Sequence, residues 1–236
     1  MTTPIRFVSL LFPQVTQLDL TGSVQVFSLL PGATIDLVWH GLEPVDTDAG
    51  FSINPTATFE SAPQADVLMV PGGQGAFDAL DDPAILDFVA RQAAGATFVT
   101  SVCTGAFVLG AVGLLAGRRA TTHWAVHSLL AKLGAIPTHG RVVRDGRVVT
   151  GGGVTSGIDF ALTVAAELCG EQVARTAQLT IEYDPDPPFD AGAPDRPQAD
   201  PRYVAEVVRA SRGKRGPTVA RAAAALREGG PGCLSM

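Results

Sequence analysis

Short apolar runs alternate with segments of helical periodicity along most of the chain. Each run predicts a buried strand, and the segment after it places apolar residues every three or four positions. Strands are expected at 6–12, 33–39, 66–70 and 96–102, and helices at 18–30, 83–94, 104–115, 122–133, 155–169 and 171–183. Two hairpins are expected, one within 45–58 and one at the Asp145-Gly146 turn of 141–149. The pattern predicts an α/β fold whose mostly parallel, flavodoxin-like sheet is sandwiched by helices.

The C-terminal part of the chain differs in composition. Asp184–Pro201 is rich in proline and acidic residues, which predicts an extended arm without a core of its own. The residues after it predict a helix, a glycine-rich break, an alanine-rich helix and a frayed tail. We therefore expect a catalytic domain at 1–190 and an arm with a C-terminal helical extension at 191–236.

Composition narrows the class of protein. The chain has 236 residues, a net charge of −6 and 46% hydrophobic residues. It has no apolar stretch long enough to cross a membrane and no basic leader before the first strand, so a cytoplasmic protein is expected. Nothing in the charge indicates nucleic-acid binding, and the basic residues after position 200 are interpreted as a solvated helix face. The three cysteines have no metal-site spacing and an odd count, which indicates free thiols in a reducing compartment.

Cys103 is the first candidate for chemistry, because it lies where a predicted strand turns into a predicted helix. Such a turn projects its side chain from the carboxyl end of the sheet, where α/β folds bind ligands. A helix N-terminus is expected to lower the pKa of a thiol, and backbone N–H groups at the turn can stabilise an anion. The alternative is a buried cysteine that packs as a small hydrophobe, which is the expectation for Cys169. Cys233 is expected to be inert in the tail.

Two more segments are expected at the same edge of the sheet. Asp19 follows the first strand between two leucines, where it either caps a helix or serves as a carboxyl whose pKa is raised by burial. Gly72 and Gly73 follow the strand at 66–70, where they either make a tight connection or let backbone N–H groups approach a ligand.

Two further patterns, the glycine-rich segments and a histidine pair, do not predict a site. The glycines at 73–75 and 151–153 lack the spacing of a phosphate-binding loop. His123 and His127 lie four residues apart, yet no third ligand is evident, so no metal site is predicted. His123 would act as a base for Cys103 only if the fold brought the two together.

Five motifs occur in the same order as in the DJ-1/PfpI superfamily, and the chain resembles that superfamily from about residue 5 to 190. They are Gln17-Leu18-Asp19-Leu20-Thr21-Gly22, Val70-Pro71-Gly72-Gly73, Ser101-Val102-Cys103-Thr104-Gly105, Arg119-Ala120-Thr121-Thr122-His123-Trp124 and the segment Thr150–Asp159. Within the superfamily they are most similar to the isocyanide hydratases. The resemblance implies a DJ-1-like fold, a homodimer with active sites near the interface, and no cofactor.

The resemblance also implies roles for single residues. Cys103 matches the nucleophile of the family and Asp19 the acidic residue beside it. Gly72, Gly73 and Thr104 would supply donors to the site, and Val154 matches a position whose backbone approaches the thiol. Thr104 stands where protease-like members carry histidine, which argues against a Cys-His peptidase. The activity implied is hydration of an isocyanide to an N-substituted formamide through a thioimidate on Cys103.

Three other functions stay open at the level of the sequence. The same scaffold serves as the ligand-sensing domain of some transcription regulators, as a thiol-based redox or stress protein, and as a glyoxalase-like or amidase-like enzyme. These would differ in DNA binding, in selective oxidation of Cys103 and in the substrates turned over.

Overall fold

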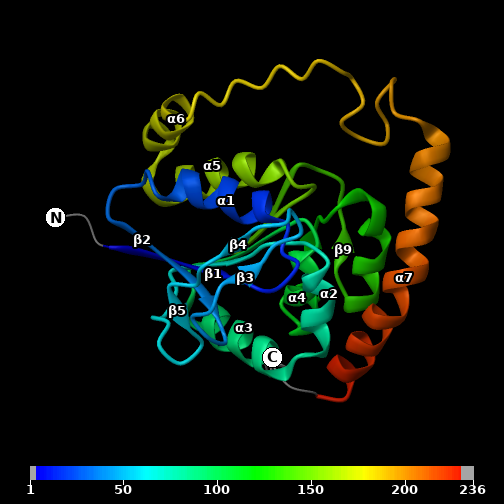
Figure 1. The fold of residues 1–236 in the computed structure, drawn as a ribbon, viewed down its shortest axis with the longest axis horizontal. Helices are drawn as coiled ribbons and strands as arrows, with labels where there is room; N and C mark the ends of the chain where they lie inside the picture. The colour runs from blue at the N-terminus through cyan, green and yellow to red at the C-terminus, as the bar shows by residue number, and fades with distance from the viewer. Residues whose placement is uncertain (1–3, 230–236) are drawn as a thin grey trace.

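A computed structural model describes residues 4–229, and its centre is a seven-stranded sheet (Figure 1). The strand order is β10-β11-β7-β6-β1-β2-β5, and every neighbouring pair is parallel except β10 with β11. The strands of this sheet are β1 (Ile5–Leu10), β2 (Ala33–Trp39), β5 (Ala57–Thr58), β6 (Val67–Val70), β7 (Phe98–Val102), β10 (Val142–Asp145) and β11 (Val148–Gly151). The predicted mostly parallel sheet is therefore confirmed.

Helices cover both faces of the sheet. Their bounds are α1 (Gln17–Phe27), α2 (Gly75–Asp78), α3 (Pro83–Gly95), α4 (Gly105–Ala111), α5 (Ser156–Cys169), α6 (Glu171–Thr180) and α7 (Pro201–Arg227). Figure 1 shows α1 and α5 on one face, α3 and α4 on the other, and α7 along one side. The 3₁₀ segments are η1 (Ala79–Asp81) and η2 (Trp124–Leu133), so the helix predicted at 122–133 is wound more tightly than expected.

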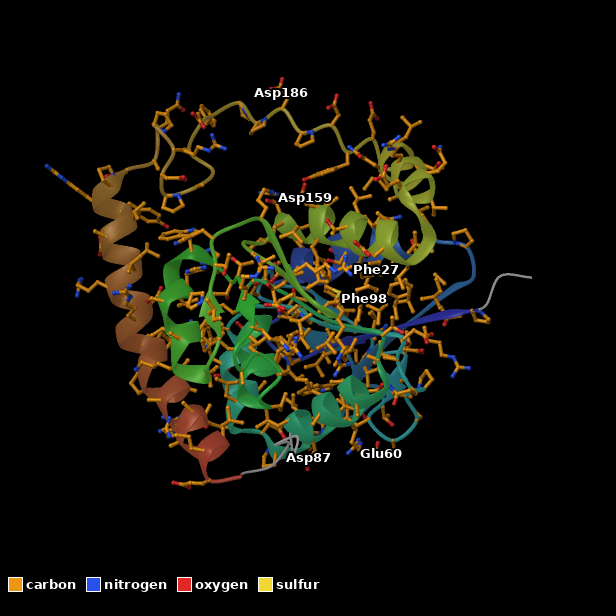
Figure 2. All side chains as sticks on the ribbon, turned by 180° about the vertical axis from the view of Figure 1, so that it is seen from behind. Phe27, Glu60, Asp87, Phe98, Asp159 and Asp186 are labelled. Carbon is orange, nitrogen blue, oxygen red and sulfur yellow. The ribbon has the colours of Figure 1, made fainter. Side chains whose placement is uncertain are left out.

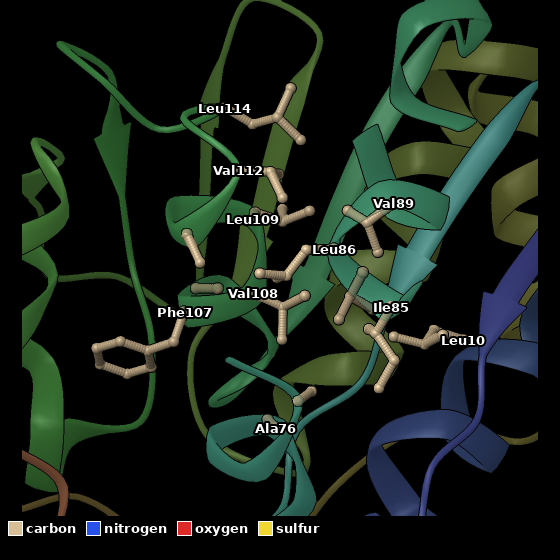
Figure 3. Close-up of a cluster of buried hydrophobic side chains, with 14 of the residues drawn as sticks. Leu10, Ala76, Ile85, Leu86, Val89, Phe107, Val108, Leu109, Val112 and Leu114 are labelled. Carbon is tan, nitrogen blue, oxygen red and sulfur yellow. The ribbon is translucent and has the colours of Figure 1, made fainter. Parts of the chain in front are cut away.

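Alternation along the strands divides the core into two parts. In β6, Val67 and Met69 face the α1/α5 side, whereas Leu68 and Val70 face the α3/α4 side. Figure 3 shows side chains of the second part, where Leu86 and Val89 of α3 lie beside Val108 and Leu109 of α4. In Figure 2, Phe27 and Phe98 point into the first part, while exposed carboxylates such as Asp186 lie at the periphery. Burial on both faces explains why the strands are apolar throughout.

The hairpin predicted within 45–58 is only partly correct. β3 (Val45–Asp46) and β4 (Ser52–Ile53) form a small antiparallel pair, but β5 pairs in parallel with β2 at the edge of the main sheet. The hairpin at Asp145-Gly146 is confirmed, since β10 and β11 pair antiparallel around it. A further small parallel pair joins β8 (Arg119–Ala120) to β9 (Ile136–Pro137).

The arm and the C-terminal helix complete the molecule. Residues 182–200 form neither helix nor strand and are almost all exposed, as predicted, and they carry the chain from α6 to α7 (Figure 1). The predicted glycine-rich break is wrong, because α7 runs continuously through Pro217. Gly216 has no Cβ to collide with the proline ring, and Val219 and Ala222 beyond it are buried against the body of the fold. No helix among residues 4–229 is long and apolar enough to span a membrane.

Candidate active site

Three neighbouring strands bring the candidate residues together. β7, β6 and β1 are adjacent in the sheet and parallel, so the segments that follow them meet at one edge. Cys103 follows β7, Gly72 follows β6, and Asp19 lies in the first turn of the helix after β1. These three residues are neighbours because of the strand order in the sheet, which cannot be deduced from any one strand alone.

Cys103 occupies the sharp turn expected of it. Its φ is +54°, in the left-handed region that residues with a Cβ seldom adopt, at a cost of about 1–3 kcal/mol. Its backbone is held from both sides, because its N–H donates to the Gly151 carbonyl at 3.1 Å and its carbonyl accepts from the Thr122 hydroxyl at 2.6 Å. These bonds fix the turn and direct the thiol away from the sheet.

Gly72 lies between the thiol and the carboxyl. A methyl group at this position would lie 2.6 Å from Asp19 Oδ2, 2.6 Å from the Thr104 nitrogen and 2.8 Å from Cys103 Cβ. The Gly72 N–H donates to Asp19 Oδ2 at 2.9 Å. Glycine is therefore required here so that Asp19 and Cys103 can pack against the same point.

Asp19 is fully buried and does not cap its helix. Thr16 stands at the N-cap position of α1, so the capping interpretation of Asp19 is wrong. Burial raises the pKa of Asp19 to about 7, against the opposing effects of the Gly72 N–H and the Cys103 thiol. Its Oδ1 has no hydrogen-bond partner within the described residues. The Cys103 thiol lies close enough to act as a hydrogen-bond partner of the carboxyl, and this contact lowers the pKa of Asp19.

Cys103 is buried, with only 5% of the residue exposed. Burial raises its pKa well above the usual range, and the Asp19 charge adds to this effect, while the Thr104 N–H opposes it. The expectation that a helix N-terminus would lower this pKa is wrong, because α4 begins in a buried environment next to a carboxyl. The two groups with raised pKa values, Cys103 and Asp19, therefore lie side by side in one buried environment.

Cys103, Thr104, Gly73 and Val154 line one cavity of about 250 Å³. The Thr104 hydroxyl accepts from the Gly73 N–H at 2.8 Å and donates to the Gly73 carbonyl at 2.9 Å. The N–H groups of Gly72 and Gly73 are therefore engaged with Asp19 and Thr104 rather than free for a ligand. Gln74 also borders this cavity, and its Oε1 is a buried acceptor with no partner in the described part of the chain.

His123 and Val154 line both this cavity and a larger neighbouring cavity of about 670 Å³. The ring of His123 caps η2 by accepting from the Ala125 N–H at 3.3 Å, and burial lowers its pKa. His127 instead lies 4.1 Å from the ring of His139, centroid to centroid. Within residues 4–229 no group of three or more His, Cys, Asp or Glu side chains is arranged to hold a metal ion.

Of the other two cysteines, Cys169 lies away from this site. Cys169 ends α5 and is partly buried beside Leu168 and Val173, near a different cavity. Cys233 falls outside the described residues.

Sequence reasoning missed the contribution of the C-terminal helix. Val207, Ser211 and Arg215 of α7 also line the Cys103 cavity. They lie four residues apart, on one face of the helix, and this spacing was the only signal available in the sequence.

Comparison with known proteins places the chain in a family. The model of the DJ-1/PfpI family matches residues 6–167, well over half of the chain. The chain belongs to the DJ-1/PfpI family. The isonitrile hydratase of Pseudomonas putida is 58% identical to this DJ-1/PfpI protein over 186 residues, covering 79% of this chain and 82% of the relative. The regulator CdhR of Pseudomonas aeruginosa, an HTH-type protein, is 29% identical over 175 residues, covering 71% of this chain and 52% of the regulator.

A solved DJ-1/PfpI structure agrees over nearly the whole length. The crystal structure of a THiJ/PfpI family protein from Pseudomonas syringae superposes with a TM-score of 0.88 at 42% identity, covering 94% of this chain and 91% of that one. The coverage extends beyond the matched family residues, so it includes parts of the arm and α7.

Proposed function

We propose that this protein is an isocyanide hydratase, which adds water to R–N≡C to give an N-substituted formamide. The observation that carries the proposal is the apposition of a buried thiol, Cys103, and a carboxyl of raised pKa, Asp19, across Gly72 at the end of a small cavity. The 58% identity to the Pseudomonas putida isonitrile hydratase supports the same reaction.

The first half of the proposed reaction forms a covalent thioimidate. Ionised Asp19 takes the proton of Cys103, and the sulfur attacks the terminal carbon of the isocyanide. Asp19 then delivers that proton to the same carbon, which gives R–N=CH–S–Cys103. The Thr104 N–H stabilises the thiolate during attack, because it favours the charged form of the sulfur.

The second half consumes water. Asp19, ionised again, accepts one proton of a water that attacks the thioimidate carbon, and passes it to the nitrogen. Collapse of the adduct expels the sulfur and releases R–NH–CHO, while the hydroxyl proton returns to the Cys103–Asp19 pair. The unpartnered Gln74 Oε1 is a suitable acceptor for this water.

We propose a cytoplasmic homodimer with the catalytic residues in the domain at 1–190. The resemblance of the ordered motifs to the superfamily supports the dimer, and an odd number of cysteines supports a reducing compartment.

Turnover of an isocyanide tests the function directly. Purified protein is incubated with a neutral aliphatic isocyanide, and the formamide is followed by NMR. Cys103→Ala is expected to lose at least about a thousandfold in kcat/KM, because the nucleophile is absent, whereas Cys169→Ala retains activity. No formamide from the wild-type protein would refute the function, and undiminished turnover by Cys103→Ala would refute the covalent step.

A further inference from the structure

One basic residue of α7 behaves differently from the others. Arg202, Arg209, Arg212, Lys214, Arg221 and Arg227 are all exposed, as a solvated helix face would be, but Arg215 is half-buried. Arg221 pairs with Asp81 on the body of the fold. The partial burial of Arg215 is therefore not explained by a role on a solvated helix face.

The position of Arg215 follows from the way α7 docks. Val219 and Ala223 are buried, and α7 packs chiefly against η2 (Figure 1). The same helix face continues one and two turns earlier as Arg215 and Ser211. There the body of the fold recedes, and these side chains form a wall of the Cys103 cavity instead of contributing to the core.

Arg215 is held in place by an aromatic ring and not by an ion pair. Its guanidinium carbon lies 4.9 Å from the centre of the Phe77 ring, a stacking arrangement that fixes the planar group. Among the described residues it forms no ion pair with a carboxylate. The nearby Asp78 is exposed and accepts a hydrogen bond from Gln74 instead.

Among the described residues that line the cavity, Arg215 is the one permanently charged side chain, and the buried Asp19 lies behind Cys103. The other described residues that line the cavity are neutral, and burial keeps His123 in its neutral form. A guanidinium has five N–H donors in a plane that matches a carboxylate. Cys103 and this group line the same open cavity of about 250 Å³, so one small molecule can contact both.

We propose that Arg215 is a specificity-determining residue, which binds a carboxylate on the substrate while the isocyanide carbon meets Cys103. The preferred substrates are then small isocyanides with a carboxylate one or two carbons from the isocyanide nitrogen. This inference rests on the proposed hydratase function and adds the substrate class to it. Val207 and Ser211 complete the wall around the linking carbons.

A matched substrate pair tests the charge preference. Isocyanoacetate and its neutral methyl ester are compared at constant ionic strength with the wild type, Arg215→Gln and Arg215→Lys. The wild type is expected to favour the anion at least about tenfold in kcat/KM, and Arg215→Gln to lose this preference because its kcat/KM falls further for the anion than for the ester. Arg215→Lys should retain part of the preference, and the exposed Arg212→Gln should change neither rate.

The result distinguishes binding of the substrate carboxylate by Arg215 from a purely structural contact of Arg215 with Phe77. If Arg215→Gln lowers both rates equally, Arg215 serves only to hold α7 on Phe77, and the proposal is overturned. An equal preference of the wild type for the two substrates overturns it as well. If the wild type hydrates a neutral aliphatic isocyanide but neither of these compounds, the proposed substrate class is overturned; if it hydrates none of the three, the hydratase function itself fails.

A second readout does not depend on hydration. Iodoacetate and iodoacetamide alkylate the same thiol, and only the first is an anion. Peptide mass spectrometry at Cys103 is expected to show that Arg215→Gln slows iodoacetate at least about fivefold relative to iodoacetamide. An unchanged ratio would overturn the anion subsite even if isocyanides are turned over, and a changed ratio would support the subsite even if they are not.

Discussion

The proposed chemistry depends on a single proton shared by two buried groups, Cys103 and Asp19. Burial raises the pKa of Asp19 to about 7, and it raises the pKa of Cys103 well above the usual range. Between these values the pair holds one proton, which is the state that can give a thiolate and a carboxylic acid. Below pH 7 the pair holds two protons, and no base is left to activate the thiol.

The pH dependence of turnover follows from this sharing. We expect kcat/KM to rise about tenfold per pH unit below pH 7 and to level off above it, since Asp19 must be ionised in the free enzyme. The measurement is initial formamide production between pH 5.5 and 8.5 with a neutral isocyanide. A flat profile over this range would mean that Asp19 does not control the thiol.

The same burial makes Asp19 costly to the folded state. Its folded pKa lies above the unfolded value of 3.8, so the folded protein loses stability relative to the unfolded chain as pH rises between these values. We expect the stability advantage of Asp19→Asn over the wild type to grow by about 3 kcal/mol between pH 5 and pH 8. Urea unfolding at each pH measures it.

An exposed carboxyl supplies the control for that comparison. Asp186 lies on the arm at the surface (Figure 2), so Asp186→Asn is expected to show no growing advantage over the same pH interval. If Asp19→Asn behaves like Asp186→Asn, the Asp19 pKa is not raised.

The location of a site residue could be predicted from the sequence where its place after a strand determines it. Cys103 and Asp19 follow apolar strands, and this was sufficient to place them at the edge of the sheet. The raised pKa of Cys103 was not predictable, because it depends on burial and on a carboxyl 84 positions earlier in the chain. The side chain of Arg215 could not be told from its exposed neighbours, because only the docking of α7 distinguishes it.

At the scale of elements, the loop after β6 controls the spacing of the pair. Gly72→Ala would place a methyl group 2.6 Å from the Thr104 nitrogen, so the loop must move away from α4. We expect a loss of about 2 kcal/mol or more in the free energy of unfolding, and at least a tenfold loss in kcat/KM. Chemical denaturation and steady-state kinetics measure the two effects.

Gly213→Ala in α7 is the matched control. No atom lies within 4 Å of the added methyl group, and the position is helical. This substitution should stabilise the protein by up to about 1 kcal/mol without changing kcat/KM. Equal behaviour of the two variants would show that Gly72 does not set the spacing of Asp19 and Cys103.

Elements with strong local sequence signals form as predicted. Elements whose form depends on tertiary packing differ from the prediction. Asp82 caps α3 with its carboxylate and Pro83 opens it, as their order in the chain predicts. The break expected near Pro217 is absent, because packing of the apolar face of α7 outweighs a local preference. The pairing of β5 with β2 was missed for the same reason: a two-residue strand carries little local signal.

At the scale of the whole molecule, the alternation of strands and helices predicted the α/β class but not the strand order. The order decides which loops meet, and so it decides that Asp19, Gly72 and Cys103 form one site. The return of α7 over the cavity was also beyond prediction, since an exposed arm does not fix where the next helix docks. The homodimer and the domain boundary at residue 190 stay predictions.

The covalent adduct on Cys103 is the most direct test of the account. Wild-type protein is mixed with an isocyanide, quenched after milliseconds with borohydride to reduce the C=N bond, and digested for mass spectrometry. The Cys103 peptide is expected to gain the mass of the isocyanide plus two hydrogens, and the Cys169 peptide to gain nothing. Formamide production with an unmodified Cys103 peptide at every quench time would contradict the proposed role of this thiol.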